Sequence, residues 1–208
     1  MRRGLFVTFE GGEGAGKSTA IAAASALLTR RGIVHLTTRE PGGTPFAEAM
    51  RSAVLNPVFR GLSAHAELLA IFSARADHVE RMILPSLNAG RWVLSDRFTD
   101  ASFAYQGGGR GFDIEVLGQL EAWVQQGLQP DLTLWFDLPA AVAAKRRAAA
   151  RAPDRFEGED EVFFARVGAA YERRAAASGG RFARLDAAAS RDAVWSQIES
   201  VVKERRWW

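Results

Sequence analysis

A glycine-rich run that ends in a lysine and a serine is the clearest candidate for chemistry. It reads GGEGAGKS and matches the spacing G-x-x-x-x-G-K-[ST]. Backbone N–H groups in such a loop converge on a bound phosphate, the lysine supplies positive charge, and the serine hydroxyl reaches Mg²⁺. We therefore predict that Lys17 is catalytic, that Ser18 is a metal ligand, and that a nucleoside triphosphate contacts Gly11, Gly12, Glu13, Gly14, Ala15, Gly16, Lys17, Ser18 and Thr19.

An acidic and a basic residue, Asp96 and Arg97, directly follow the apolar run at 92–95. Ligands of open α/β sheets bind at the carboxyl ends of the strands, where Asp96 and Arg97 would lie. Asp96 is predicted to hold Mg²⁺ or its water, and Arg97 to bind phosphate. By itself an Asp-Arg pair is as often a structural ion pair, but the glycine-rich loop favours the functional interpretation.

Short apolar runs alternate with amphipathic segments along the whole chain. Strands are predicted at 5–9, 33–38, 91–95, 132–136 and 181–185, and helices at 18–31, 65–84, 113–126, 140–149, 161–177 and 193–204. This alternation predicts an α/β fold in which helices cover both faces of a mostly parallel sheet, in a single domain over 1–208. The charged segment 151–160 breaks the pattern and is either a solvated loop or a mobile lid.

Composition excludes several classes of protein. The 208 residues are 48% hydrophobic, carry a formal net charge of +3 and include no cysteine, which excludes a disordered chain, a disulfide framework and a thiolate metal site. The three histidines have no metal-binding spacing. No apolar stretch reaches 18 residues and no cleavable signal opens the chain, so we expect a cytoplasmic protein without a membrane partner. The nearly balanced charge argues against nucleic acid as a partner.

Five motifs in one order resemble those of the bacterial thymidylate kinases. They are FEGGEGAGKST, REPGGT, FSAR, SDRF and AYQGGGRG, and the match covers essentially the whole chain. The resemblance implies a P-loop kinase fold with a five-stranded parallel sheet, and a homodimer formed through helices. It also implies transfer of the γ-phosphoryl group of ATP to dTMP, which gives dTDP and ADP for dTTP synthesis. The partners would then be dTMP and ATP, with Mg²⁺ as cofactor.

The resemblance also implies where the base and the phosphate of the acceptor bind. Phe72 would stack on thymine, and Arg75 would hydrogen-bond the base, since residues i and i+3 of a helix lie side by side. Arg51 would join Arg97 in binding the phosphate, because two guanidinium groups both neutralise and orient a dianion. The alternatives are core packing for Phe72 and a solvated position for Arg51.

The remaining acceptor contacts come from two other motifs. Glu13 would contact the sugar 3′-hydroxyl and help to arrange the Mg²⁺ environment, or would only stabilise its loop. Ser102 and Tyr105 would line the base and the 2′ face, with Gln106 beside them. The stretch Gly107-Gly108-Gly109-Arg110 is expected to form a turn.

Catalysis needs further positive charge on the transferring group. Gly14 stands where one subgroup of the family carries an arginine, so the charge is expected from a lid at about 147–160. Arg151 is the first candidate, followed by Arg147 and Arg155; the alternative is a basic helix face. With these arginines, the predicted catalytic set contains Lys17, Asp96, Arg97 and Glu13.

Two other kinds of function stay open at this point. One is another nucleotide or deoxynucleoside kinase, which would differ in whether its acceptor already carries a phosphate. The other is a nucleotide-switched binding module or a basic nucleic-acid binder. The presence of Lys17, Ser18 and Asp96 favours turnover over either binding role.

Overall fold

Five short strands form the centre of the molecule, in a computed structural model that describes residues 3–59, 61–139, 142–143, 146, 156 and 159–207. The strands are β1 (Phe6–Gly11), β2 (His35–Arg39), β3 (Trp92–Asp96), β4 (Leu132–Asp137) and β5 (Phe182–Asp186). Their order is β2-β3-β1-β4-β5, and every neighbouring pair is parallel. The predicted five-stranded parallel sheet is thus confirmed. All strand ends that carry predicted site residues consequently lie at one edge of the sheet.

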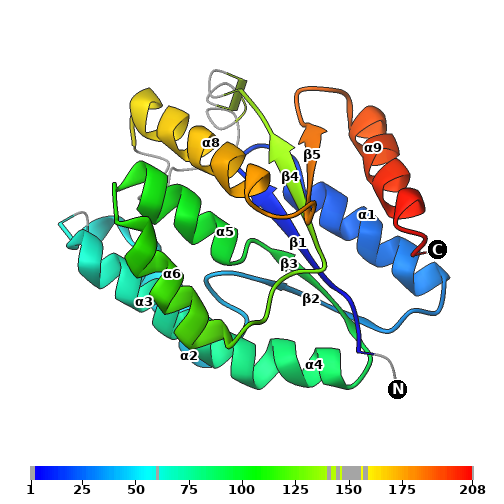
Figure 1. Ribbon diagram of the computed structural model, residues 1–208, viewed down its shortest axis with the longest axis horizontal. Helices are drawn as coiled ribbons and strands as arrows, with labels where there is room; N and C mark the ends of the chain where they lie inside the picture. Colours follow the sequence, from blue (N-terminus) through cyan, green and yellow to red (C-terminus); the bar gives the residue numbers. More distant parts are fainter. Residues whose placement is uncertain are drawn as a thin grey trace.

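Helices cover both faces of this sheet (Figure 1). Their bounds are α1 (Lys17–Arg30), α2 (Pro45–Leu55), α3 (Ala64–His78), α4 (Leu84–Asn88), α5 (Thr99–Ser102), α6 (Ile114–Gln125), α8 (Glu161–Ala176) and α9 (Arg191–Glu204), with a 3₁₀ turn, η1 (Pro57–Phe59). In Figure 1, α1 and α9 lie to the right of the sheet and α8, α5, α6 and α3 to its left. The predicted helix at 140–149 falls outside the described residues, except for positions 142, 143 and 146. No helix among the described residues is long and apolar enough to cross a bilayer.

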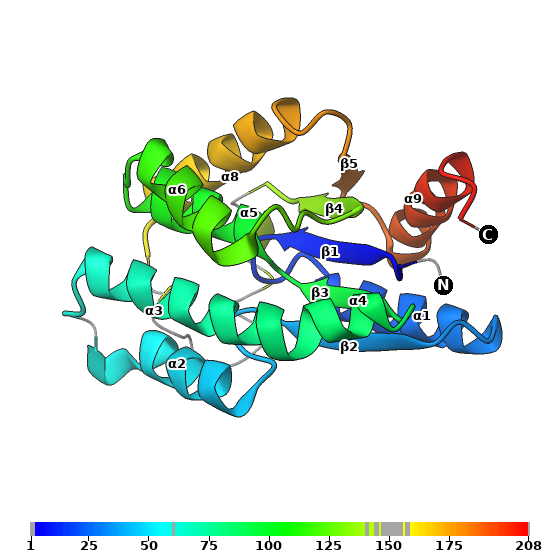
Figure 2. The ribbon, with the colours of Figure 1, turned by 60° about the horizontal axis from the view of Figure 1, so that its bottom comes forward.

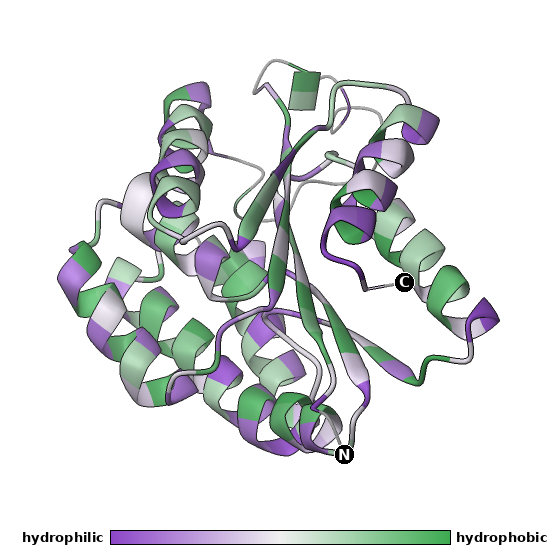
Figure 3. Ribbon diagram, turned by 45° about the vertical axis from the view of Figure 1, so that its right-hand side comes forward, coloured by the Kyte–Doolittle hydropathy of each residue, from purple (hydrophilic) through white to green (hydrophobic). Residues whose placement is uncertain are grey.

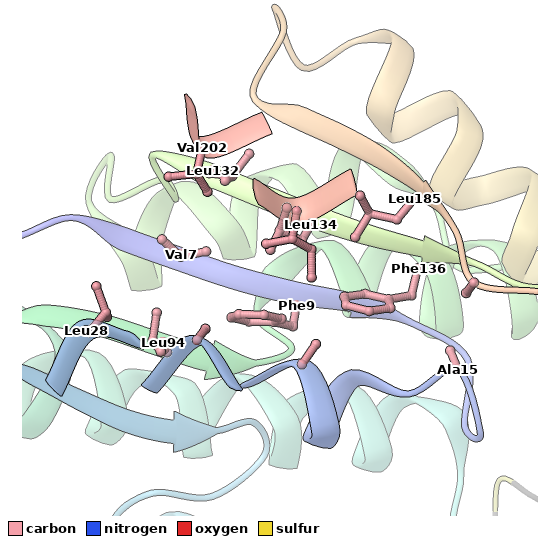
Figure 4. Packing of buried hydrophobic residues seen from close by; sticks show 14 residues of the cluster. Val7, Phe9, Ala15, Leu28, Leu94, Leu132, Leu134, Phe136, Leu185 and Val202 are labelled. Carbon is pink, nitrogen blue, oxygen red and sulfur yellow. The ribbon is translucent and has the colours of Figure 1, made fainter. Parts of the chain in front are cut away.

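The two faces of the sheet bury different sets of side chains, because successive residues of a strand point to opposite faces. Val7 and Phe9 of β1 pack with Leu134 and Phe136 of β4 and with residues of α1 and α9 (Figure 4). Figure 3 shows hydrophobic residues along much of the central strands, and hydrophobic and hydrophilic residues mixed along the surrounding helices. The other face carries the alternate residues of β1, so Glu10 points away from the Val7 and Phe9 side.

The predicted helix at 65–84 is helical over a longer stretch, but it is not one regular α-helix. After α3 the chain forms a wider π-turn, η2 (Val79–Ile83), and then continues as α4 to Asn88. Figure 2 shows α3 and α4 following one another along the sheet. Pro85 lies in the first turn of α4, directly after the π-turn, and it has no N–H with which to continue the regular bonding of α3. The wide turn therefore allows the helix to pass the proline.

The stretch at 107–110 is expected from the sequence to form a turn, and for its three glycines that expectation is wrong, whereas Arg110 does lie in a turn. The glycines belong to a π-helical segment, η3 (Phe103–Gly109), that packs against α8. A Cβ at Gly108 would lie 2.5 Å from that of Ala170, and one at Gly109 would lie 2.5 Å from the Phe163 ring. These glycines are thus required for the close approach of α8.

Candidate active site

The glycine-rich loop connects the buried strand β1 to the first turn of α1. Gly14 and Gly16 adopt left-handed backbone conformations, with φ of 79° and 92°. Gly16 occupies the N-cap position of α1, and none of the described side chains caps the first N–H groups of this helix. Uncapped N–H groups at a helix N-terminus carry partial positive charge that attracts anions. The loop therefore has the geometry of a phosphate site.

Lys17 lies in this loop with only 5% of its surface exposed. Its Nζ donates hydrogen bonds to the carbonyl oxygens of Gly11, at 3.1 Å, and Gly12, at 2.9 Å. Burial lowers the pKa of Lys17, and the positive charge of Arg97 lowers it further. The ammonium group thus lies in a water-excluded environment next to another positive charge, where a bound anion would stabilise its charged form.

Arg97 connects the glycine-rich loop to the end of β3. Its Nη1 donates to the carbonyl of Gly11 at 2.8 Å, and its Nη2 donates to the Glu13 carboxylate at 2.6 Å. Its guanidinium carbon lies 5.0 Å from the centre of the Tyr105 ring. The structure thus brings together Arg97, Glu13 and Tyr105, which the sequence placed in one site.

A cavity lies beside this group, between the sheet edge, α2, α3 and η3. Seven of the eight residues predicted to bind the acceptor line it: Glu13, Arg51, Arg75, Arg97, Ser102, Tyr105 and Gln106. Arg51 enters from α2, where its Nη1 donates to the Pro41 carbonyl at 3.0 Å. Two aromatic residues near or within the predicted lid, Phe156 and Phe164, also line this cavity. We name it the acceptor cavity.

Arg75 is the most deeply buried charged group of the acceptor cavity. Its Nε donates to the Glu40 carboxylate at 2.7 Å, and its Nη2 donates to the Ser102 hydroxyl at 2.9 Å. Its Nη1 is buried and has no hydrogen-bond partner among the residues that the structure describes. An unpaired buried donor is costly unless something accepts from it. A polar acceptor atom on a ligand in the cavity would supply that partner.

Glu40, which was not among the predicted site residues, holds Arg75 in place. Burial by itself would raise the pKa of Glu40, but Arg75 and His78 lower it below its usual value. His78, which carried no expected role, reaches Glu40 with Nδ1 at 3.0 Å and the Thr38 hydroxyl with Nε2 at 2.8 Å. Glu40 is part of the REPGGT motif and directly follows β2. Its position at the carboxyl end of a strand is the feature of the sequence that could have identified it as a site residue.

Phe72 lies deeper than its expected role requires. It is 2% exposed, packs with Leu68, Phe103 and Leu117, and is not among the residues that line the acceptor cavity. The guanidinium carbon of Arg75 lies 4.6 Å from the centre of its ring. The stacking of Phe72 on a base stays a prediction, and the geometry favours a role in supporting Arg75.

A second cavity lies on the other side of the same loop, between α1 and α9. It is lined by Gly14, Ala15, Gly16 and Thr19, and by residues of the segment between β5 and α9. Arg146 lines it as well, and its Nη1 donates to the carbonyl of Ala187 at 3.0 Å. We name it the donor cavity. Glu13 and Gly14 are neighbours in the chain, so one loop contributes to both cavities.

Asp96 and Ser18 provide oxygen atoms suited to a hard divalent cation. The Oδ1 atom of Asp96 is buried and accepts no hydrogen bond from the described part of the chain, and Ser18 is exposed in the first turn of α1. Among the described residues, no group of three or more His, Cys, Asp or Glu side chains surrounds a possible metal position. These donors fit Mg²⁺, which keeps waters and substrate phosphates among its ligands.

The candidate lid arginines Arg147, Arg151 and Arg155 lie outside the described residues. Within the segment, Phe156 is described, and its ring lies 5.8 Å from that of Tyr105. Arg110 forms an ion pair with Glu159 at 2.7 Å and lies 5.5 Å from the Phe156 ring. The described part of this segment therefore contacts the wall of the acceptor cavity.

Glu10 is a second buried carboxyl that was not among the predicted site residues. Its Oε1 accepts from the backbone N–H of Phe98 at 2.7 Å, and its Oε2 accepts from the Tyr171 hydroxyl at 2.7 Å. Burial, with the negative charge of Asp100 nearby, raises the pKa of Glu10 to about 8. The side chain is therefore mainly uncharged at pH 7.

This raised pKa predicts a specific dependence of stability on pH. The folded state binds the Glu10 proton more tightly than the unfolded chain, so the contribution of this group to stability is greatest below pH 4.5 and falls as the pH rises to about 8. We expect the unfolding free energy of the wild type, minus that of a Glu10→Gln variant, to fall by up to about 1.4 kcal/mol per pH unit in this range. Urea denaturation between pH 5 and 8 measures it, and a constant difference would contradict it.

Comparison with known proteins agrees with this geometry. The family model described as thymidylate kinase matches residues 9–198. A thymidylate kinase from Paracidovorax citrulli is 53% identical, over 99% of this chain and 95% of that protein. One from Albidiferax ferrireducens is 50% identical, over 98% of this chain and 97% of that protein. The crystal structure of the Ehrlichia chaffeensis thymidylate kinase superimposes with a TM-score of 0.76 at 29% identity, and the match covers 96% of this chain and 99% of that one.

Proposed function

The chain belongs to the thymidylate kinase family and is an ATP-dependent nucleoside monophosphate kinase that converts dTMP to dTDP, and we propose how its residues divide that work. This proposal rests on one observation, which is that the glycine-rich loop lines both cavities: Glu13 lines the acceptor cavity and Gly14 lines the donor cavity. A donor and an acceptor bound on the two sides of this loop would present their phosphates to each other. Holding two reactants in this way is the main task in phosphoryl transfer.

dTMP occupies the acceptor cavity. Arg97 and Arg51 bind its phosphate, and the unpartnered Nη1 of Arg75 donates to an oxygen of the base. The phosphate needs no general base, because a dianion is already a nucleophile. Ser102, Tyr105 and Gln106 line the wall beside the sugar and base.

ATP occupies the donor cavity, with its phosphates on the loop. The free N–H groups at the start of α1 and the ammonium group of Lys17 bind the β- and γ-phosphates. Ser18 and Asp96 hold Mg²⁺, which neutralises charge on the phosphates when it is bound. Arg146 lines the part of this cavity between the loop and the β5–α9 segment, where the rest of the nucleotide would lie.

The remaining positive charge comes from the segment at about 147–160, which we treat as a lid within one kinase domain of residues 1–208. Arg151 stays the first candidate and Arg147 the second. The contacts of Phe156 with Tyr105 support closure of this segment over the acceptor cavity. Closure would exclude water as a competing acceptor.

A homodimer through helices stays part of the proposal. Leu69 of α3 and Trp123 of α6 are 60% and 78% exposed, and the two helices pack against each other. Ile114 at the start of α6 is also exposed. Large apolar side chains on the outer surface of adjacent helices suit an interface with a second copy.

A cytoplasmic location, and the absence of nucleic acid among the partners, stay predictions.

The activity is tested by measuring ADP release from ATP and Mg²⁺ with dTMP, dUMP, dCMP, dGMP, AMP and thymidine, each against a control without acceptor. We expect the highest kcat/KM with dTMP and no turnover above the control with thymidine, because Arg51 and Arg97 require an acceptor phosphate. Turnover with thymidine alone would indicate a nucleoside kinase. ADP release that no acceptor stimulates would indicate a binding module.

A further inference from the structure

The backbone of Arg97 has a conformation that its side chain does not favour. Its φ is 71°, in the left-handed region, which is unfavourable for a residue with a Cβ. Arginine has no local preference for this region, unlike glycine or asparagine. Contacts outside the residue must therefore maintain the conformation.

Three hydrogen bonds hold the peptide groups on both sides of Arg97. Its own N–H donates to the carbonyl of Phe9 at 3.0 Å, and the Ser95 hydroxyl donates to its carbonyl at 2.7 Å. The next N–H, that of Phe98, donates to Glu10 Oε1 at 2.7 Å. The last of these bonds comes from a side chain on a different strand, so the tertiary fold supplies it.

The direction of the Arg97 side chain depends on this backbone. The guanidinium group reaches Gly11 and Glu13 on the glycine-rich loop and lines the acceptor cavity. Because the bond to Phe9 holds the preceding peptide, a change of φ at Arg97 would rotate its Cα–Cβ bond and the peptide between Arg97 and Phe98 together about the N–Cα bond. That rotation would break the bond from Phe98 N–H to Glu10 and move the guanidinium group away from this place. Positioning errors of about 1 Å in a reacting site lower rates strongly.

We propose that Glu10 is a positioning residue: by accepting the Phe98 N–H it keeps Arg97 in the left-handed conformation that directs its guanidinium group to the acceptor phosphate. Glu10 itself is fully buried and lines neither cavity. The inference rests on the proposed role of Arg97 and adds a residue that acts through it. Tyr171 has a different role, because its hydroxyl donates to the other carboxyl oxygen of Glu10, Oε2.

Three variants separate positioning from a merely structural role. Glu10→Met removes the acceptor of the Phe98 N–H, and we expect the KM for dTMP to rise about tenfold to a hundredfold while the KM for ATP changes less than about twofold. Glu10→Gln keeps a carbonyl oxygen for that N–H and should restore the KM for dTMP. Tyr171→Phe leaves the bond to Phe98 intact, so it should reduce thermal stability without raising the KM for dTMP.

A double-variant cycle with Arg97 completes the test. In an Arg97→Met background the guanidinium group is absent, so adding Glu10→Met should change the KM for dTMP by less than about twofold. An equal rise in the KM values for dTMP and ATP, or a rise that persists in full without Arg97, would overturn the inference. Ser95→Ala, which removes another of the three bonds, should raise the KM for dTMP in the same direction even if Glu10→Met does not fold. Wild-type protein that does not phosphorylate dTMP would instead refute the proposed function.

Discussion

A Lys17→Met variant is expected to lose about a thousandfold in kcat while keeping or gaining stability. The loss follows from the proposed role of the ammonium group, which stabilises charge on the phosphates during transfer. The gain follows from its burial: the pKa of Lys17 is lowered by burial and by Arg97, so the folded state disfavours its positive charge. Methionine fills a similar volume without that charge.

Steady-state assays with dTMP and ATP measure the loss, and thermal unfolding measures the stability. The matched control is Lys203→Met, which removes an exposed lysine of α9 and should change neither quantity. A Lys17→Met variant that keeps more than about a tenth of the wild-type kcat would contradict the catalytic role. A clear fall in its melting temperature would contradict the account of an unfavourable buried charge.

An Arg75→Met variant is expected to lose both stability and acceptor binding. Removal of one partner of a buried ion pair leaves the Glu40 carboxylate without its strongest counter-charge, which costs about 3–5 kcal/mol. The same change removes the donor that we assign to the base of dTMP. We therefore expect kcat/KM for dTMP to fall about a hundredfold or more.

The two effects of Arg75 separate in a double variant. Arg75→Met combined with Glu40→Gln leaves no uncompensated charge, so most of the lost unfolding free energy should return. The loss in kcat/KM for dTMP should remain, because no donor to the base is restored. Arg81→Met serves as the control, since Arg81 is 74% exposed in its ion pair with Asp77 and should affect stability by less than about 1 kcal/mol. Recovery of dTMP activity in the double variant would show that Arg75 is only structural.

Local chemistry along the chain was sufficient for the fold class and for the glycine-rich loop. Apolar runs of strand length alternate with helix-length segments, and that pattern alone predicts a parallel sheet between helices. Lys17 and Ser18 follow the glycines at the spacing G-x-x-x-x-G-K-[ST], and Asp96 and Arg97 follow an apolar run of strand length. Each of these signals lies within about ten consecutive residues, so it can be recognised from the sequence without knowing which distant segments meet in the fold.

The tertiary structure decided the parts that depend on contacts between distant segments. Arg75 meets Glu40, and Glu10 meets Phe98 and Tyr171, across separations that no spacing rule covers. A carboxyl group in a strand looks the same in sequence whether water or an arginine lies beside it, so only the fold determines its charge and its role.

Three further features were settled by packing rather than by local preference. The glycines of η3 are helical because α8 approaches too closely for side chains, although glycine runs are typical of turns. Arg97 keeps a left-handed backbone because neighbouring strands hold the peptides on either side. Phe72 and Arg75 are indeed adjacent, as i and i+3 positions require, but the depth of Phe72 depends on Leu68, Phe103 and Leu117 around it. The sequence by itself thus determined which chemical groups are present and in what order, whereas burial and distant partners decided how each one is oriented and charged.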